Sequence, residues 1–166
     1  MKSPITAKQF FLTLNITYYM QAFAVLAFAL VVYFISLQNE SAPVGDVNTW
    51  MYIVIIVLIS ALVMAYFIFR LLVGRIQSSM KLQEKMPRYA RALFVRSALI
   101  EIPGLLAAIA SIITGNPQFL AVPMVIVVLF AILRPTKNSI AMDLNLSTKE
   151  KNALDDENAV VSEVNR

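Results

Sequence analysis

Four long apolar segments, separated by short polar stretches, make up most of the chain. They cover residues 10–37, 50–73, 89–114 and 119–133. A membrane-spanning helix needs about 20 mainly apolar residues; the fourth segment is shorter than that and contains Pro123, which a helix tolerates near its start. The pattern therefore predicts an all-α integral membrane protein with residues 1–134 as its membrane domain. We expect four spans packed as a four-helix bundle of two helical hairpins.

The third apolar segment has one face of small and polar residues and an opposite face of large apolar ones. Both faces repeat every three or four residues, which is the period of an α-helix. Small residues let helices approach closely in a membrane. The small face is therefore predicted to be a helix-packing seam around Glu101, formed by Ser97, Gly104, Ala108, Ser111 and Gly115.

Glu101 is an ionisable residue on this packing face, where a charge is costly and often functional. It follows Arg96 by five residues, or about 7–8 Å along a helix axis. The first segment offers a facing seam that begins at Asn15 and Tyr19 and continues through Ala22, Leu26, Ala29, Tyr33 and Ser36. We expect an intramembrane polar cluster composed of Glu101, Asn15, Tyr19, Gln21, Arg70 and Arg96.

Three roles for Glu101 are compatible with the pattern. An ion pair with Arg96 or Arg70 would simply fix the register of the helices, and such polar pairs in membranes contribute only about 0.6 kcal/mol on average. The carboxylate could instead handle an ion or a proton, or it could dock a partner protein.

The basic residues indicate the orientation of the chain in the membrane. They gather before the first segment, between the second and third, and after the fourth, whereas the first and third loops contain none. Since cytoplasmic loops are enriched in lysine and arginine, we expect both termini and the central loop on the cytoplasmic side of a cell inner membrane. The loop between Arg70 and Arg96 is then expected to contact anionic lipid. Within it, residues 74–85 could form a helix on the membrane surface or continue the second spanning helix.

Residues 135–166 are predicted to be a cytoplasmic tail. Ile140 and Leu144 suit one or two amphipathic turns, and Ser147 with Glu150 has the spacing of a capping box that begins a short helix through Leu154. The remainder, residues 155–166, is acidic and has no aromatic residue. Such composition predicts disorder.

Composition excludes several classes of function. The chain is 59% hydrophobic and 14% charged, against about 45–50% and about 25% in soluble domains. Without cysteine or histidine, thiolate chemistry and zinc catalysis have no ligands, so no metal or cofactor is expected. The net charge of +4 is explained by membrane orientation and does not indicate nucleic-acid binding. No nucleophile–base pair or phosphate loop is present, and the protein is not expected to be an enzyme.

The second half of the chain resembles a group of uncharacterised small four-span bacterial membrane proteins. The resemblance rests on RSALIEIPGLLA from Arg96, on the Thr114-Gly115-Asn116 turn, and on RPTK from Arg134 followed by DLNLS from Asp143. More distantly, the topology is similar to the ATP synthase protein I family, which carries an acid in its third span and is linked to assembly of the membrane rotor and to cation handling. In that family a basic residue follows the acid by a few positions, where this chain has residues 102–105.

Two functions from different classes follow from these observations. The first is a non-enzymatic accessory or assembly subunit of a membrane complex, with a membrane protein or further copies of itself as partner. The alternative is an oligomeric small transporter or an ion or proton conductor that uses Glu101. Four short spans leave little room for a pathway within one copy, so conduction would require self-association.

Overall fold

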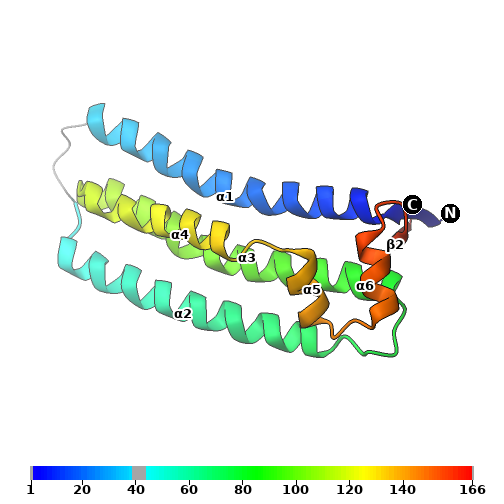
Figure 1. Cartoon of the computed structure of the whole chain (residues 1–166). Coiled ribbons are helices and arrows are strands. Elements are labelled where there is room, and N and C mark those ends of the chain that lie inside the picture. Colours follow the sequence, from blue (N-terminus) through cyan, green and yellow to red (C-terminus); the bar gives the residue numbers. More distant parts are fainter. Residues whose placement is uncertain (1, 39–43, 166) are drawn as a thin grey trace. The chain divides into compact units, whose positions relative to one another are not determined.

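The computed structural model describes residues 2–38 and 44–165 and is mostly helical (Figure 1). Three long helices come first: α1 (Ala7–Gln38), α2 (Val47–Gly74) and α3 (Leu82–Thr114). A 3-10 turn, η1 (Pro117–Leu120), leads into α4 (Ala121–Ile132). The remaining elements are α5 (Lys137–Asp143), α6 (Thr148–Asp155) and two strands, β1 (Lys2–Thr6) and β2 (Val160–Asn165).

Helices α1, α2 and α3 are long and apolar enough to cross a membrane, which confirms the first three predicted spans. The fourth predicted span corresponds to η1 and α4, and the count reaches four if Pro117–Ile132 and Lys137–Asp143 form one bent span. The loop predicted between the first two spans falls partly on residues 39–43, which lie outside the described residues.

Both interpretations of residues 74–85 were wrong. Helix α2 ends at Gly74, and α3 already begins at Leu82. Between them the backbone makes tight turns, with the Ile76 amide donating to the Val73 carbonyl (2.9 Å) and the Met80 amide donating to that of Gln77 (3.1 Å). These turns leave neither a surface helix nor an extension of α2.

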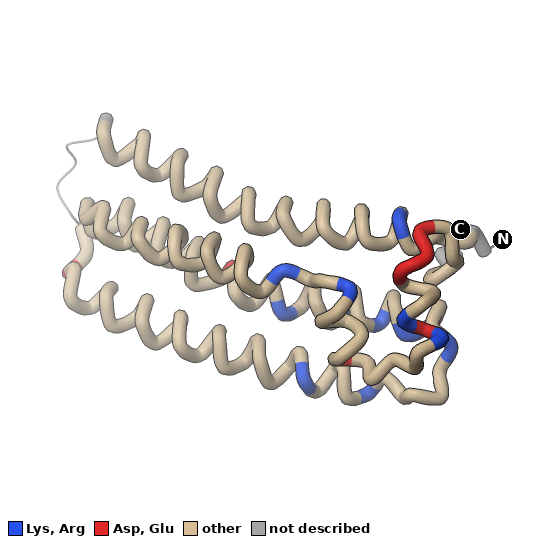
Figure 2. The backbone as a smooth tube through the Cα atoms, in the orientation of Figure 1, with Lys and Arg blue, Asp and Glu red and all other residues tan. Residues whose placement is uncertain are grey.

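The described chain divides into two compact units. The span unit comprises Tyr19–Tyr66 and Arg96–Leu133; the tail unit comprises Met1–Tyr18, Phe67–Val95 and Arg134–Arg166. Each long helix contributes residues to both units. Figure 2 shows how the charged residues are distributed along the chain, and by sequence Arg96 is the one lysine or arginine in the span unit.

The span unit packs small and aliphatic residues inside and large apolar residues outside. Its interior includes Val54 of α2, Ala107 and Ala110 of α3, and Phe119 of η1, all buried. Large side chains of the same helices are open to the surroundings, among them Ile56 (63% exposed) and Ile102 (48% exposed). This distribution suits a lipid environment, because lipid tails are as apolar as the helices and close packing favours small residues at the interfaces.

The tail unit is an ordered assembly that joins the two ends of the chain. Strands β1 and β2 pair in antiparallel orientation, with Lys2 opposite Asn165 and Ile5 opposite Ser162. The predicted disorder of residues 155–166 was therefore wrong over β2. The expected short helices are confirmed as α5 and α6, and the Ser147–Glu150 capping box is present. Apolar side chains of α5, α6, the turn between them and β2 are buried in the unit: Ile140, Leu144, Leu146, Leu154 and Val161.

Candidate functional site

The six residues predicted to form one polar cluster are divided between the two units. Asn15 and Arg70 belong to the tail unit. Tyr19, Gln21, Arg96 and Glu101 belong to the span unit, where Gln21 is hydrogen-bonded to Ser97 and Arg96 to Leu133. The structure therefore does not assemble the six residues into one site within either unit.

Gln21 connects α1 to the packing face of α3. The buried Ser97 hydroxyl donates a hydrogen bond to Gln21 Oε1 at 2.5 Å. A further contact occurs at Gly104, where an added Cβ would lie 3.0 Å from Val25 Cγ1 of α1 and 3.4 Å from Ile126 Cγ1 of α4. Helices α1 and α3 thus pack against each other within the span unit, but α1 contributes Gln21 and Val25, which lie outside its predicted seam.

The packing seam on α3 is largely as predicted. Ser97, Gly104, Ala108 and Ser111 are buried. Gly115 differs, since it is exposed and lies just beyond the helix with a positive φ of 64°. Glycine adopts that conformation without steric cost, so Gly115 serves the turn between α3 and η1 instead of the seam.

The seam predicted on α1 was placed on the wrong face. Tyr19 is 46% exposed and Tyr33 is 45% exposed. The buried stripe of α1 in the span unit instead consists of Ala22, Val25, Ala29 and Val32. The two stripes share Ala22 and Ala29, and the buried stripe is rotated by roughly 50°, about half of the angle between neighbouring residues on a helix.

Arg96 caps the end of α4. Its Nη2 donates a hydrogen bond of 3.0 Å to the carbonyl oxygen of Leu133, the C-cap residue of that helix. The last carbonyls of a helix have no partner within it, and a cation there also interacts favourably with the helix dipole. The contact brings the end of α4 back beside Arg96 on α3.

Glu101 is half-buried beside the seam, between the buried Ile100 and the exposed Ile102. Within residues 2–38 and 44–165 its carboxylate has no hydrogen bond or ion pair. Of the two ion pairs that the sequence allowed, the one with Arg96 is therefore not formed within the span unit, and Arg70 belongs to the tail unit. A carboxylate at the edge of a packing face can receive a hydrogen bond or a cation from a molecule outside this chain.

The tail unit contains a polar arrangement that the sequence analysis missed. The Lys85 ammonium lies 2.6 Å from Glu150 Oε1, and only 2% of the Lys85 side chain is exposed. One turn further along α3, the Tyr89 hydroxyl donates to Asp143 Oδ2 at 2.9 Å. Lys85 and Tyr89 of α3 thus contact α6 and α5 respectively, through acidic side chains more than 50 residues away in sequence.

A periodic signal could have identified Lys85. Leu82, Lys85, Met86, Tyr89 and Leu93 are all buried and share one helical face of α3. A lysine on such a face requires an acidic partner, because a buried charge is costly unless it is paired. The partner itself, Glu150, was recognised only as a helix cap.

Burial and hydrogen bonding act in opposite directions on Glu150. Burial of the carboxyl group favours its neutral form and raises its pKa. Hydrogen bonds from Lys85 and from the Ser147 backbone and hydroxyl favour the charged form, and together they have the larger effect. The pKa of Glu150 is therefore lowered from its ordinary value of 4.5. The carboxylate remains charged at neutral pH, as the ion pair with Lys85 requires.

No group of three or more acidic, histidine or cysteine side chains suited to a metal ion occurs in the part of the chain that the structure describes. Comparison with known proteins finds no matching family model, curated protein or solved structure. The length and apolar character of α1, α2 and α3 are those of a small multi-span membrane protein.

Proposed function

We propose that this protein is a non-enzymatic accessory or assembly subunit of a membrane complex. In this proposal the chain crosses a cytoplasmic (inner) membrane four times, with both termini and the Arg70–Arg96 loop on the cytoplasmic side. The exposed Arg75, Arg88 and Arg91 of the tail unit would then meet anionic lipid there.

Two observations support four crossings. First, β1 precedes α1 and β2 ends the described chain, yet the two strands pair. An odd number of crossings would separate them by the membrane. Second, the hydrogen bond between Arg96 and Leu133 supports a return of η1 and α4 along α3. The 16 residues from Pro117 to Ile132 make about 24 Å of helix, close to the hydrocarbon thickness of about 30 Å.

The single observation that carries the accessory function is the environment of Glu101. A charged group in a spanning helix is expensive unless it is paired, and this carboxylate has no partner among the described residues. Its position at the edge of the packing face leaves it accessible to a helix of another protein. A donor or cation on that helix would offset the cost of burying the charge.

The interior of the span unit argues against a pathway within one copy. Its buried side chains are mostly apolar, such as Val54, Ala107 and Phe119. The buried hydroxyls of Ser97 and Thr114 are hydrogen-bonded within the unit, so an ion would find few polar groups there. The alternative function, conduction through an oligomer, remains supported only by the same Glu101 carboxylate, which several copies could direct toward a shared axis.

The test compares Glu101→Gln with Glu84→Gln, an identical change at an exposed acid in the first turn of α3. Each variant is extracted gently from its native membrane, and the intact complex is weighed by mass spectrometry. We expect a hetero-complex whose recovery falls several-fold with Glu101→Gln and is unchanged with Glu84→Gln. A homo-oligomer that loses ion flux in liposomes with Glu101→Gln would establish the alternative. Equal recovery from all three proteins would refute the accessory function.

A further inference from the structure

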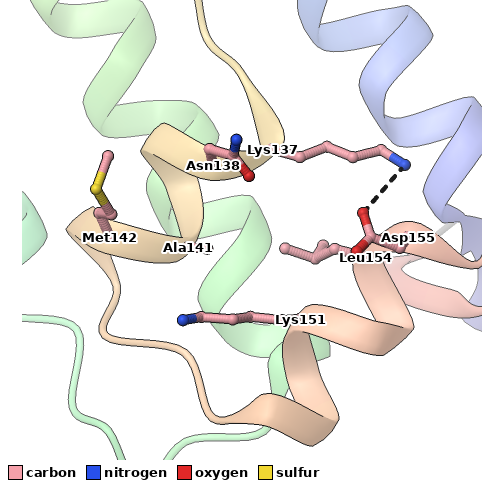
Figure 3. Close-up of a pocket in the computed structure, with 7 residues that line it drawn as sticks. All are labelled: Lys137, Asn138, Ala141, Met142, Lys151, Leu154 and Asp155. Atoms are coloured by element: carbon pink, nitrogen blue, oxygen red, sulfur yellow. Dashed lines mark ion pairs between the residues drawn. The ribbon is translucent and has the colours of Figure 1, made fainter.

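The tail unit contains an open pocket of about 330 Å³ between α5 and α6 (Figure 3). Its lining combines basic, polar and apolar side chains. They include Lys137, Asn138 and Met142 from α5, with Lys151, Leu154 and Asp155 from α6. The residues come from two helices that are each held in place by a capping box and by buried apolar side chains. The pocket is therefore formed by ordered elements.

Two lysines line the pocket, Lys137 from α5 and Lys151 from α6, and Figure 3 shows the Lys137 side chain extending toward Asp155. The Lys137 ammonium is 3.7 Å from Asp155 Oδ1, and the two side chains are 42% and 74% exposed. An exposed ion pair of this kind contributes little stability, so Lys137 can exchange Asp155 for a stronger anion. Lys151 is exposed and has no ion pair with any residue in the described part of the chain.

Apolar side chains form the rest of the wall. Leu154, near the C-terminal end of α6, is almost fully buried, and Met142 is 71% exposed. A ligand that satisfies both kinds of wall has an anionic group for the lysines and a hydrocarbon portion for Met142. A small inorganic anion would leave the apolar wall without a contact.

The pocket also follows closely on the last apolar helix. Only residues 133–136 separate the end of α4 from Lys137 at the start of α5. Because an extended chain covers at most about 3.6 Å per residue, α5 must remain near the end of the fourth span. In the proposed topology that position is the cytoplasmic surface of the membrane, where phospholipid headgroups are the most abundant anions.

We propose that this pocket binds the phosphate group of an anionic ligand, supplied by a membrane phospholipid. Lys137 and Lys151 hold the phosphate as point charges, Asn138 can donate a further hydrogen bond, and Met142 contacts the glycerol or acyl portion. Asp155 opposes binding, since it competes for Lys137 and repels the ligand.

The test uses the full chain in a neutral detergent. A short-chain phosphatidic acid, a short-chain phosphatidylcholine and inorganic phosphate are each titrated, and bound ligand is counted by native mass spectrometry. Lys137→Gln and Lys151→Gln should each weaken binding of phosphatidic acid about fivefold, the effect of one basic residue near a membrane surface. Lys149→Gln is the matched control, because Lys149 is exposed on the same helix and does not line the pocket.

Asp155→Asn provides a gain of function that partial unfolding could not mimic. It should tighten binding of phosphatidic acid about fivefold. Inorganic phosphate that competes as well as phosphatidic acid would retain the phosphate site but assign it a soluble ligand. Equal weakening by Lys149→Gln, weaker binding by Asp155→Asn, or no binding of any phosphate by the unaltered protein would overturn the proposal.

Discussion

Replacing Glu150 by glutamine tests the ion pair that holds α6 against α3. The change removes the carboxylate 2.6 Å from the Lys85 ammonium and leaves a lysine whose side chain is only 2% exposed. Removing one partner of a buried pair costs about 3–5 kcal/mol. Because the Glu150 side chain is 21% exposed, water can partly replace it, and we expect the lower figure of about 2–3 kcal/mol.

This loss should appear as easier detachment of α6 and β2. A cost of about 2–3 kcal/mol raises the detached population roughly 30- to 150-fold. Hydrogen exchange of the amides of α6 and β2 measures that population directly, with the amides of α2 as an internal reference for global unfolding. The assay is performed on the protein in detergent or in a lipid nanodisc.

Glu157→Gln is the matched control for this prediction. Glu157 also pairs with a lysine, at 3.0 Å from Lys8, but the two side chains are 69% and 63% exposed. Exposed pairs contribute about 0–1 kcal/mol, so exchange in the tail should change little. Equal acceleration by Glu157→Gln and Glu150→Gln, or none by Glu150→Gln, would refute the assignment of the energy to the buried Lys85 pair.

Acidification should reproduce the effect of the substitution. Burial raises the pKa of Glu150, but hydrogen bonds from Lys85 and Ser147 lower it by more, so the pKa lies below its ordinary value of 4.5. A lowered pKa in the folded state contributes stability that is present above about pH 4.5 and is lost as the pH falls through the folded value. Relative to their intrinsic exchange rates at each pH, the tail amides of the unaltered protein should therefore lose protection below pH 4.5, whereas the Glu150→Gln protein should lack this step.

Two further predictions concern packing and capping. Gly104→Leu should destabilise the span unit by about 1–3 kcal/mol, because an added Cβ already lies 3.0 Å from a Val25 methyl group. The loss should lower the thermal midpoint in detergent. Gly74→Ala is the control: a Cβ there meets no atom within 4 Å, so the midpoint should stay nearly unchanged. An unchanged midpoint for Gly104→Leu would contradict the close approach. Ser147→Ala removes the side chain that caps α6 and should destabilise that helix by about 1 kcal/mol. The loss should appear as faster amide exchange confined to α6. Exchange at the rate of the unaltered protein would exclude a stabilising cap.

The positions of the long apolar helices could be predicted from the sequence. The apolar stretches in α1, α2 and α3 are long enough to leave no other stable form in a bilayer, where every backbone amide must be satisfied within the segment. The buried seam of α3 could also be predicted, because its small residues recur at helical spacing and include Gly104, which permits close contact.

The face of α1 that packs inward could not be predicted in the same way. In water the apolar face of a helix is the buried face, but lipid is as apolar as a protein interior. Hydrophobicity therefore does not distinguish Val25 and Val32, which are buried, from Leu30 and Val31, which are exposed. Only the shapes of the neighbouring helices decide between the two faces.

The tail shows most clearly what depended on tertiary structure. The capping box at Ser147 is local and could be predicted from four residues. The strand pairing of Lys2 with Asn165 and the ion pair of Lys85 with Glu150 join residues that are distant in sequence. Local stretches of sequence specify which segments are helical and apolar, because both properties depend on neighbouring residues. Which charges meet, and that the acidic end is ordered, was decided by contacts between distant segments, which no local pattern encodes.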